Sequence, residues 1–225
     1  VWYNYLMGKP QNKVKIKWSA KFAYAIGLIT TDGNLSPNGR HLDFTSADKE
    51  QIENFMDCLG IDVKVTIKTG TFSKKKILRV QFSDIIFYQF LMSIGLTPRK
   101  SKTIGKIKIP DKYFFDFLRG HLDGDGTFYS YWDPRWRSSF MFYMEFVSAS
   151  KKHIVWLRKE IKKFIGISGH VTKAQTSSIY QLKYAKADTL KLLPKIYPNK
   201  NVVHLSRKYL KIKAVLAIIM KQSLI

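Results

Sequence analysis

The stretch AYAIGLITTDG (residues 23–33) decides the fold, and a related stretch, FLRGHLDGDG (residues 117–126), occurs once more along the chain. Small residues recur at a four-residue step in both stretches, including Gly27 in the first and Gly120 in the second. Each stretch is therefore predicted to form the last turns of a buried helix with one flat side. Glycine inside a helix costs roughly 0.5–1 kcal/mol relative to alanine, and close approach of another backbone is the usual reason to keep it. The two helices are expected to pack against each other.

An acid stands at the end of each predicted helix. Asp32 and Asp125 precede Gly33 and Gly126, which occupy the position where a left-handed residue most often ends a helix. Unpaired carbonyls and the helix dipole make the potential negative at this end, so two carboxylates gathered there would repel each other. A divalent cation would remove the conflict, and carboxylate oxygens suit magnesium or calcium rather than zinc.

These residues resemble the two signature helices of the LAGLIDADG homing endonucleases. The core of the motif corresponds to residues 27–33 and 120–126, although Thr30 stands where the motif has its first acid. The second copy departs from the pattern at Arg119 and His121. The second acid of the motif is the metal ligand in that family, so the resemblance assigns this role to Asp32 and Asp125.

The resemblance also implies an activity. The family cuts both strands of a long, asymmetric double-stranded DNA site with a divalent metal and leaves short 3′ overhangs. The expected cofactor is Mg²⁺, held by the two acids with help from the backbone carbonyls of Thr31 and Gly124, and Ca²⁺ is expected to support binding without cleavage. Lys100 and Lys208 resemble the family's basic residue beside the catalytic water, although plain contact with a phosphate is an alternative.

Ser46 and Ser148 match each other in the two halves of the chain and occupy the place of a polar active-site residue in the family. Either serine could instead cap the helix that follows it. The histidines lack metal-ligand spacing, and His121 is interpreted as a packing residue. His153 lies on a predicted helix with no evident partner.

The composition indicates a polyanion as the partner. The chain has 225 residues, 45% of them apolar, and its 39 Lys and Arg residues against 16 acids give a net charge of +23. Such an excess, spread along predicted strands, favours nucleic acid. The single cysteine excludes a disulfide within one chain, and a membrane span is not expected. We expect a protein of the prokaryotic cytoplasm, associated with the nucleoid, or of an organellar matrix.

The chain is a tandem duplication. Residues 44–52 (FTSADKEQI) match residues 146–154 (FVSASKKHI), and LSRK at 205–208 matches LTPRK at 96–100. The predicted domains are residues 1–105, an N-terminal arm with the first repeat, and residues 106–225, the second repeat. Each repeat is predicted as αββαββα, an α+β fold with helices on one face of an antiparallel sheet. Two repeats related by a pseudo-twofold would form a DNA-binding saddle, and a monomer is expected because the duplication supplies the twofold.

Period-two alternation in the predicted strands separates an apolar face from a polar one. A polar row of this kind could address base edges and phosphates in a DNA groove, or could be an ordinary solvated face. The residues predicted to contact DNA are Lys64, Thr66, Lys68, Arg79, Gln81, Ser83, Arg135, Arg137, Lys173, Gln181 and Lys183.

Three functions remain open on these observations. The first is a site-specific DNA endonuclease encoded by an intron. The second is a maturase that binds its host intron RNA, and the third is a DNA-binding regulator that no longer cuts. Retention of both Asp32 and Asp125 favours cleavage, because clustered negative charge gives a pure DNA binder no advantage.

Overall fold

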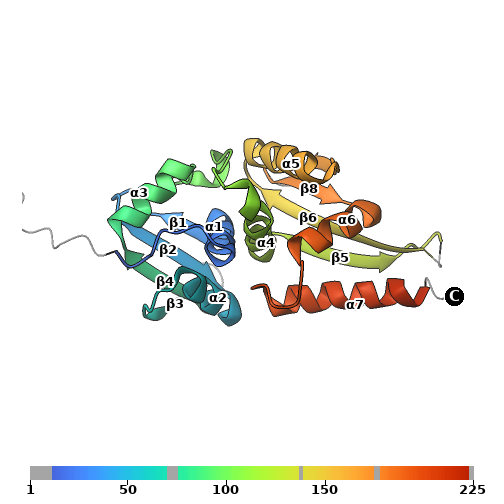
Figure 1. The fold of residues 1–225 in the computed structure, drawn as a ribbon, viewed down its shortest axis with the longest axis horizontal. Helices are drawn as coiled ribbons and strands as arrows, with labels where there is room; N and C mark the ends of the chain where they lie inside the picture. Colours follow the sequence, from blue (N-terminus) through green and yellow to red (C-terminus); the bar gives the residue numbers. More distant parts are fainter. Residues whose placement is uncertain (1–11, 70–75, 137–138, 175–177, 223–225) are drawn as a thin grey trace, which may run out of the picture.

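The computed structural model describes residues 12–69, 76–136, 139–174 and 178–222. Two four-stranded antiparallel sheets lie on either side of a central helix pair, α1 and α4 (Figure 1). The first half comprises α1 (Ala20–Asp32), β1 (Gly33–Leu35), β2 (His41–Ser46), α2 (Lys49–Leu59), β3 (Val65–Thr69), β4 (Lys76–Ser83) and α3 (Ile85–Ile94). The second half comprises α4 (Phe114–Gly124), β5 (Thr127–Trp132), β6 (Phe140–Ser148), α5 (Lys151–Ile165), β7 (His170–Lys173), β8 (Tyr180–Tyr184) and α6 (Lys186–Ile196).

The predicted α+β fold with two αββαββα repeats is confirmed. The strand orders are β1-β2-β4-β3 and β5-β6-β8-β7, so the two sheets have the same topology. Short 3-10 turns, η1 (Lys100–Lys102) and η2 (Asp111–Tyr113), lie in the connection between the halves. A further helix, α7 (Ser206–Gln222), follows the second repeat and runs beside β5 (Figure 1).

The central helices approach each other as closely as the glycines predict. A Cβ atom placed on Gly27 would lie 2.7 Å from the His121 nitrogen and 2.9 Å from the Gly120 Cα atom. A Cβ atom on Gly120 would lie 2.9 Å from the Tyr24 carbonyl carbon. Side chains normally stay farther apart than this, so only glycine fits at either position.

The prediction that Gly33 and Gly126 adopt a left-handed conformation is wrong. Gly33 has φ −81° and enters β1 directly, and Gly126 is not among the glycines with positive φ. The reason for glycine is steric, because a Cβ atom on Gly33 would lie 2.7 Å from the Ile29 Cα atom. A Cβ atom on Gly126 would lie 2.6 Å from the Leu122 Cα atom. Each chain segment thus folds back over its own helix at the point where the acid emerges.

One face of each sheet packs against helices, as the alternation predicts. The buried apolar side chains of β6, all at most 4% exposed, are Phe140, Phe142, Met144 and Phe146. Those of β2 and β4 are Leu42, Phe44, Val80 and Phe82. The edge strand β3 differs, because Ile67 is 61% exposed although it lies on the side predicted to face the core.

The segment before α1 lies against the first repeat. The carboxylate of Asp84 accepts hydrogen bonds from the backbone nitrogens of Lys13 (2.8 Å) and Val14 (3.0 Å) and from that of Phe87 at the start of α3 (2.8 Å). Ser19 is the N-cap of α1, and its Oγ accepts from the Phe22 nitrogen at 3.1 Å. In the part of the chain that the structure describes, no helix combines the length and apolar character needed to cross a membrane.

Candidate functional site

Asp32 and Asp125 emerge side by side from the ends of α1 and α4. Burial and the neighbouring charge of Asp125 raise the pKa of Asp32 to about 6, against a hydrogen bond from Thr31 Oγ1 to Asp32 Oδ2 (3.1 Å). Burial also raises the pKa of Asp125, which Lys208 and Lys100 partly offset. The ionised form of each carboxylate is therefore less well stabilised in the protein than in water.

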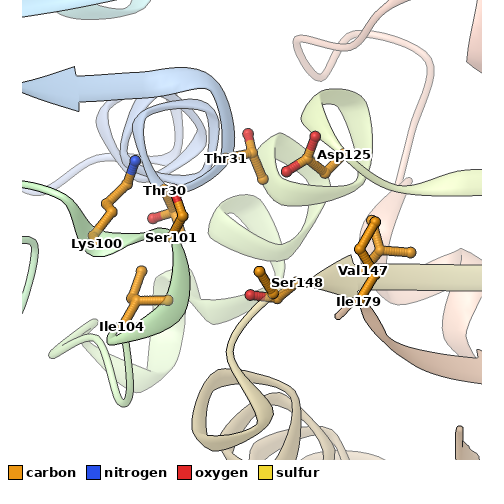
Figure 2. A pocket seen from close by; sticks show the side chains of 10 residues that line it. Thr30, Thr31, Lys100, Ser101, Ile104, Asp125, Val147, Ser148 and Ile179 are labelled. Atoms are coloured by element: carbon orange, nitrogen blue, oxygen red, sulfur yellow. The ribbon is translucent and has the colours of Figure 1, made fainter. Parts of the chain in front are cut away.

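Each acid lines its own pocket. Asp125 lines a pocket of about 210 Å³ together with Thr31, Lys100 and Ser148, and Figure 2 shows Ser148 across the opening from the ends of the two helices. Asp32 lines a larger pocket of about 590 Å³. Part of the remaining lining of the two pockets corresponds under the duplication: residues 45–47 stand in the larger pocket where residues 147–149 stand in the smaller, and Ile77 stands in place of Ile179.

The two predicted lysines lie at the ends of the central helices. The ammonium nitrogen of Lys208 lies within hydrogen-bond distance of the carbonyl oxygens of Leu122 (2.7 Å), Asp123 (2.8 Å), Gly124 (3.0 Å) and Gly126 (2.7 Å), which share its three N–H donors. The ammonium group of Lys100 donates to the Gly33 carbonyl. Burial lowers the pKa of both lysines to about 8, while the carboxylates of the site act in the opposite direction. Both amines remain largely protonated at pH 7 beside the carboxylates.

The predicted ligands suit a hard divalent cation. Asp32 and Asp125 supply carboxylate oxygens, and their raised pKa values show that added positive charge would stabilise the ionised forms. Gly124 is next to Asp32, because a Cβ atom on Gly124 would lie 2.7 Å from Asp32 Oδ2. Its carbonyl accepts from Lys208 but has a second lone pair available. Among the described residues no third His, Cys, Asp or Glu side chain joins the pair.

Ser46 and Ser148 reach the pockets as expected and also shape the turns that start α2 and α5. Ser46 Oγ accepts from the Asp48 nitrogen (3.0 Å), and Ser148 Oγ accepts from the Ser150 nitrogen (3.1 Å). Neither serine is the N-cap, which is Asp48 in α2 and Ser150 in α5. The matched pair therefore has a local structural role that leaves its position at the pocket intact.

Sequence reasoning missed three polar residues around the acids. Asp123 is fully buried and accepts from Tyr24 Oη and from the Leu205 nitrogen, both at 2.8 Å. Glu50 accepts from the Ser206 nitrogen at the start of α7 (3.0 Å), and Gln51 of α2 reaches Asp32, with its Nε2 atom 3.4 Å from Oδ2. Asp123 is the first acid of the second motif, and this position could have drawn attention to it.

The predicted DNA contacts of the first repeat mostly share one face of the sheet. The register pairs Thr66 with Arg79 and Lys68 with Ile77, on the face that turns away from the helices, and Gln81 and Ser83 follow in alternation. Lys64 precedes β3. Arg79 is bound to Asp43 on the neighbouring strand, with its Nη2 2.7 Å from Asp43 Oδ1. This pair fixes the guanidinium above the sheet.

The second repeat brings together only part of its predicted set. Gln181 and Lys183 share a face, where Lys183 lies 3.6 Å from Glu145 Oε2 and over the Tyr129 ring. Lys173 pairs with Tyr180, so the register sets it in alternation with Thr172, which pairs with Gln181, and on the opposite face from Gln181 and Lys183. Arg135 lies in the loop between β5 and β6, bound to Asp133 (3.0 Å), and Arg137 lies outside the described residues.

His121 is a packing residue, as interpreted from the sequence. Its Nε2 atom lies 3.2 Å from Nε2 of His153, and the two buried rings stack with their centroids 5.2 Å apart. Burial lowers the pKa of both histidines, that of His153 to about 4. His153 thus has a partner that the sequence alone did not indicate.

Solved structures with the same fold include both DUF199/WhiA proteins and homing endonucleases. Full-length DUF199/WhiA from Thermatoga maritima matches with a TM-score of 0.55 and 14% identity over 95% of this chain and 70% of that one. Meganuclease I-SmaMI bound to uncleaveable DNA matches with a TM-score of 0.61 and 13% identity over 94% and 92% of the two chains. The homing endonuclease I-GzeII in complex with its DNA target gives 0.57 and 12% over 91% and 92%. At these identities the likeness shows the fold.

A search of curated proteins found no match. The model of the WhiA LAGLIDADG-like domain matches residues 21–109 and 116–220, which is most of the chain and includes both central helices with their acids. The protein belongs to the WhiA LAGLIDADG-like domain family.

Proposed function

We propose that the chain is a divalent-metal-dependent endonuclease that cuts both strands of a specific DNA duplex. The observation that carries the proposal is the paired arrangement of one acid, one lysine and one serine around the ends of α1 and α4. A protein that only binds DNA gains nothing from Asp32 and Asp125, because both carboxylates would face the phosphates of the duplex.

In this proposal the chain's own residues divide the work. Asp32 and Asp125, with the carbonyls of Thr31 and Gly124, would hold the metal ions. Bound Mg²⁺ supplies a more acidic water and offsets charge on the phosphate. Lys100 and Lys208, held by backbone carbonyls, place positive charge where the phosphate becomes more negative. One acid for each strand would give a staggered double-strand break.

The polar faces of the two sheets would hold the duplex. In the first repeat the Arg79–Asp43 pair presents a guanidinium in a fixed orientation, which suits contact with a base edge. The related structures of I-SmaMI and I-GzeII contain bound DNA, which supports the same use of this fold here. A single chain already supplies two repeats, so we propose that it acts as a monomer.

The test is cleavage of a randomised double-stranded DNA library in Mg²⁺ and in Ca²⁺, with sequencing of the ends. We expect discrete staggered ends at one long sequence in Mg²⁺, and retention of the same sequence without cutting in Ca²⁺. The Asp32→Asn, Asp125→Asn double variant should lose cutting and keep DNA affinity within a few-fold. Full activity in the double variant would refute the site assignment.

A DNA-binding regulator that does not cut is the second candidate. The observation in its favour is the ammonium group of Lys208, which occupies the carbonyls at the end of α4, including that of Gly124. Selective retention of one duplex sequence by the wild-type protein in Mg²⁺, with no broken ends, would establish this function. Retention of intron RNA in place of DNA would indicate a maturase.

A further inference from the structure

Residues 51 and 153 occupy the same position in the two repeats, on the first turns of α2 and α5, but they make different contacts. Gln51 is 4% exposed, and its Nε2 atom lies 3.4 Å from Asp32 Oδ2 and 3.3 Å from the Asp123 carbonyl oxygen. Its Oε1 atom accepts a hydrogen bond from Ser46 Oγ at 2.7 Å. Because Ser46 holds the oxygen, the amide nitrogen of Gln51 is directed toward Asp32.

His153 uses both of its ring nitrogens elsewhere. Nδ1 donates to the Gly105 carbonyl at 2.7 Å, so Nε2 of this buried neutral ring accepts from Nε2 of His121. In the structure as far as it is described, Ser148 donates to no group on His153, in contrast to the bond between Ser46 and Gln51. Within the described residues, no side chain donates a hydrogen bond to the Asp125 carboxylate.

We infer that Gln51 is a positioning residue for the Asp32 carboxylate, and that the two halves of the site are therefore inequivalent. This inference rests on the proposed endonuclease function. The chain Ser46–Gln51–Asp32 holds one acid from α2, while no described side chain of α5 holds Asp125 in this way. The strand served by Asp32 consequently depends on residue 51, and the strand served by Asp125 does not depend on residue 153.

The first measurement follows each strand separately. Duplexes labelled on one strand or the other are cut under single-turnover conditions, and the Asp32→Asn and Asp125→Asn single variants identify the strand that each acid serves. In Gln51→Met, which keeps the length of the side chain and removes its donor, we expect cutting of the Asp32 strand to slow about tenfold or more. The other strand should stay within about twofold, which also shows that the variant is folded.

His153→Met is the matched control, because it changes the same position of the other repeat. It should leave the ratio of the two strand rates unchanged, whatever it does to stability. Equal slowing of both strands by Gln51→Met, with the ratio kept, would overturn the inference and leave the endonuclease intact. Absence of cutting in the wild-type protein would instead count against the proposed function.

A second readout does not use activity. Carbon-13 NMR titration of the metal-free protein follows the carboxyl carbons of Asp32 and Asp125. Loss of an N–H donor should raise the pKa of Asp32 in Gln51→Met and leave that of Asp125 in place. An unchanged Asp32 titration together with an unchanged strand ratio would show that Gln51 serves only to join α2 to the end of α4.

Discussion

At the scale of single residues, the defining feature is a pair of acids whose pKa values are both raised by burial. Burial is the main cause of the raised pKa of Asp32, and the nearby carboxylate of Asp125 adds to it. The charges of Lys208 and Lys100 lower the pKa of Asp32, but burial and the carboxylate of Asp125 outweigh them. The negative charge of these two carboxylates is therefore unfavourable in the protein alone, and a phosphate-bound cation would neutralise it.

The cost can be measured through the pH dependence of stability. Asp32 has a pKa of about 6 in the folded protein against an ordinary value of 3.8, so the folded state holds the proton more tightly. The stability that this group contributes is present below pH 3.8 and is lost as the pH rises through about 6. We expect Asp32→Asn to exceed the wild type by about 1–2 kcal/mol in the free energy of unfolding at pH 7, and by much less at about pH 4.

Urea denaturation of both metal-free proteins at the two pH values provides the measurement. Asp57→Asn is the control, because Asp57 is an exposed carboxylate paired with Lys21 on the surface. It should change the free energy of unfolding by less than about 0.5 kcal/mol at either pH. A wild type as stable as Asp32→Asn at neutral pH would show that the acid is not strained.

At the scale of secondary-structure elements, the crossing of α1 and α4 sets the geometry of the site. Gly27→Ala should destabilise the protein by about 3 kcal/mol or more, because the new methyl group would meet backbone atoms of α4, which cannot move aside as a side chain could. Gly105→Ala is the control, since a Cβ atom there meets none of the described atoms within 4 Å and should be tolerated within about 0.5 kcal/mol.

Thermal and urea unfolding of the two variants would decide this prediction. If Gly27→Ala keeps wild-type stability, the helices are not in backbone contact. In that case the positions of Asp32 and Asp125 would have to be fixed from elsewhere. A variant that unfolds partly at room temperature would agree with the prediction and could still be compared by its denaturation midpoint.

The elements also show how far the sequence could predict this structure. The glycine spacing predicted the buried helices that form α1 and α4, and the duplication predicted two repeats of the same topology, because both depend on patterns that the sequence shows directly. The conformation of Gly33 was missed because it depends on contact with Ile29 rather than on helix termination. The face of Lys173 depends on the register with β8, which no local pattern specifies.

The candidate site likewise contains residues that the sequence could indicate and residues that it could not. Asp32, Asp125, Lys100 and Lys208 could be predicted because the motif and the duplication mark them in pairs. Gln51 was not predicted, because its role arises only when α2 packs beside the end of α4, and its counterpart His153 has a different side chain and different contacts. Duplicated positions indicate common placement in the fold without indicating common chemistry.

At the scale of the whole molecule, each repeat holds the lysine-bearing segment of the other. Glu50 of α2 accepts from Ser206, and Asp48 pairs with Arg207 at 2.7 Å, just before Lys208. In the opposite direction, Ser150 of α5 donates to the Ile104 carbonyl beyond Lys100. Because these contacts cross between repeats, the site depends on both halves of the chain being folded together.

The charge of the whole molecule makes a last prediction about which face binds DNA. Lys68 and Lys183 lie on the polar faces of the two sheets, whereas Lys159 and Lys162 are exposed on α5, which packs on the helix side. If DNA lies on the polar faces, Lys68→Ala with Lys183→Ala should reduce the magnitude of the slope of log affinity against log salt by about 1 for each phosphate that is no longer neutralised. Lys159→Ala with Lys162→Ala removes the same charge and should leave the slope unchanged. Fluorescence anisotropy over a range of salt concentrations measures the slope of each double variant. An equal change in the two double variants would place the duplex elsewhere or show that binding follows net charge alone.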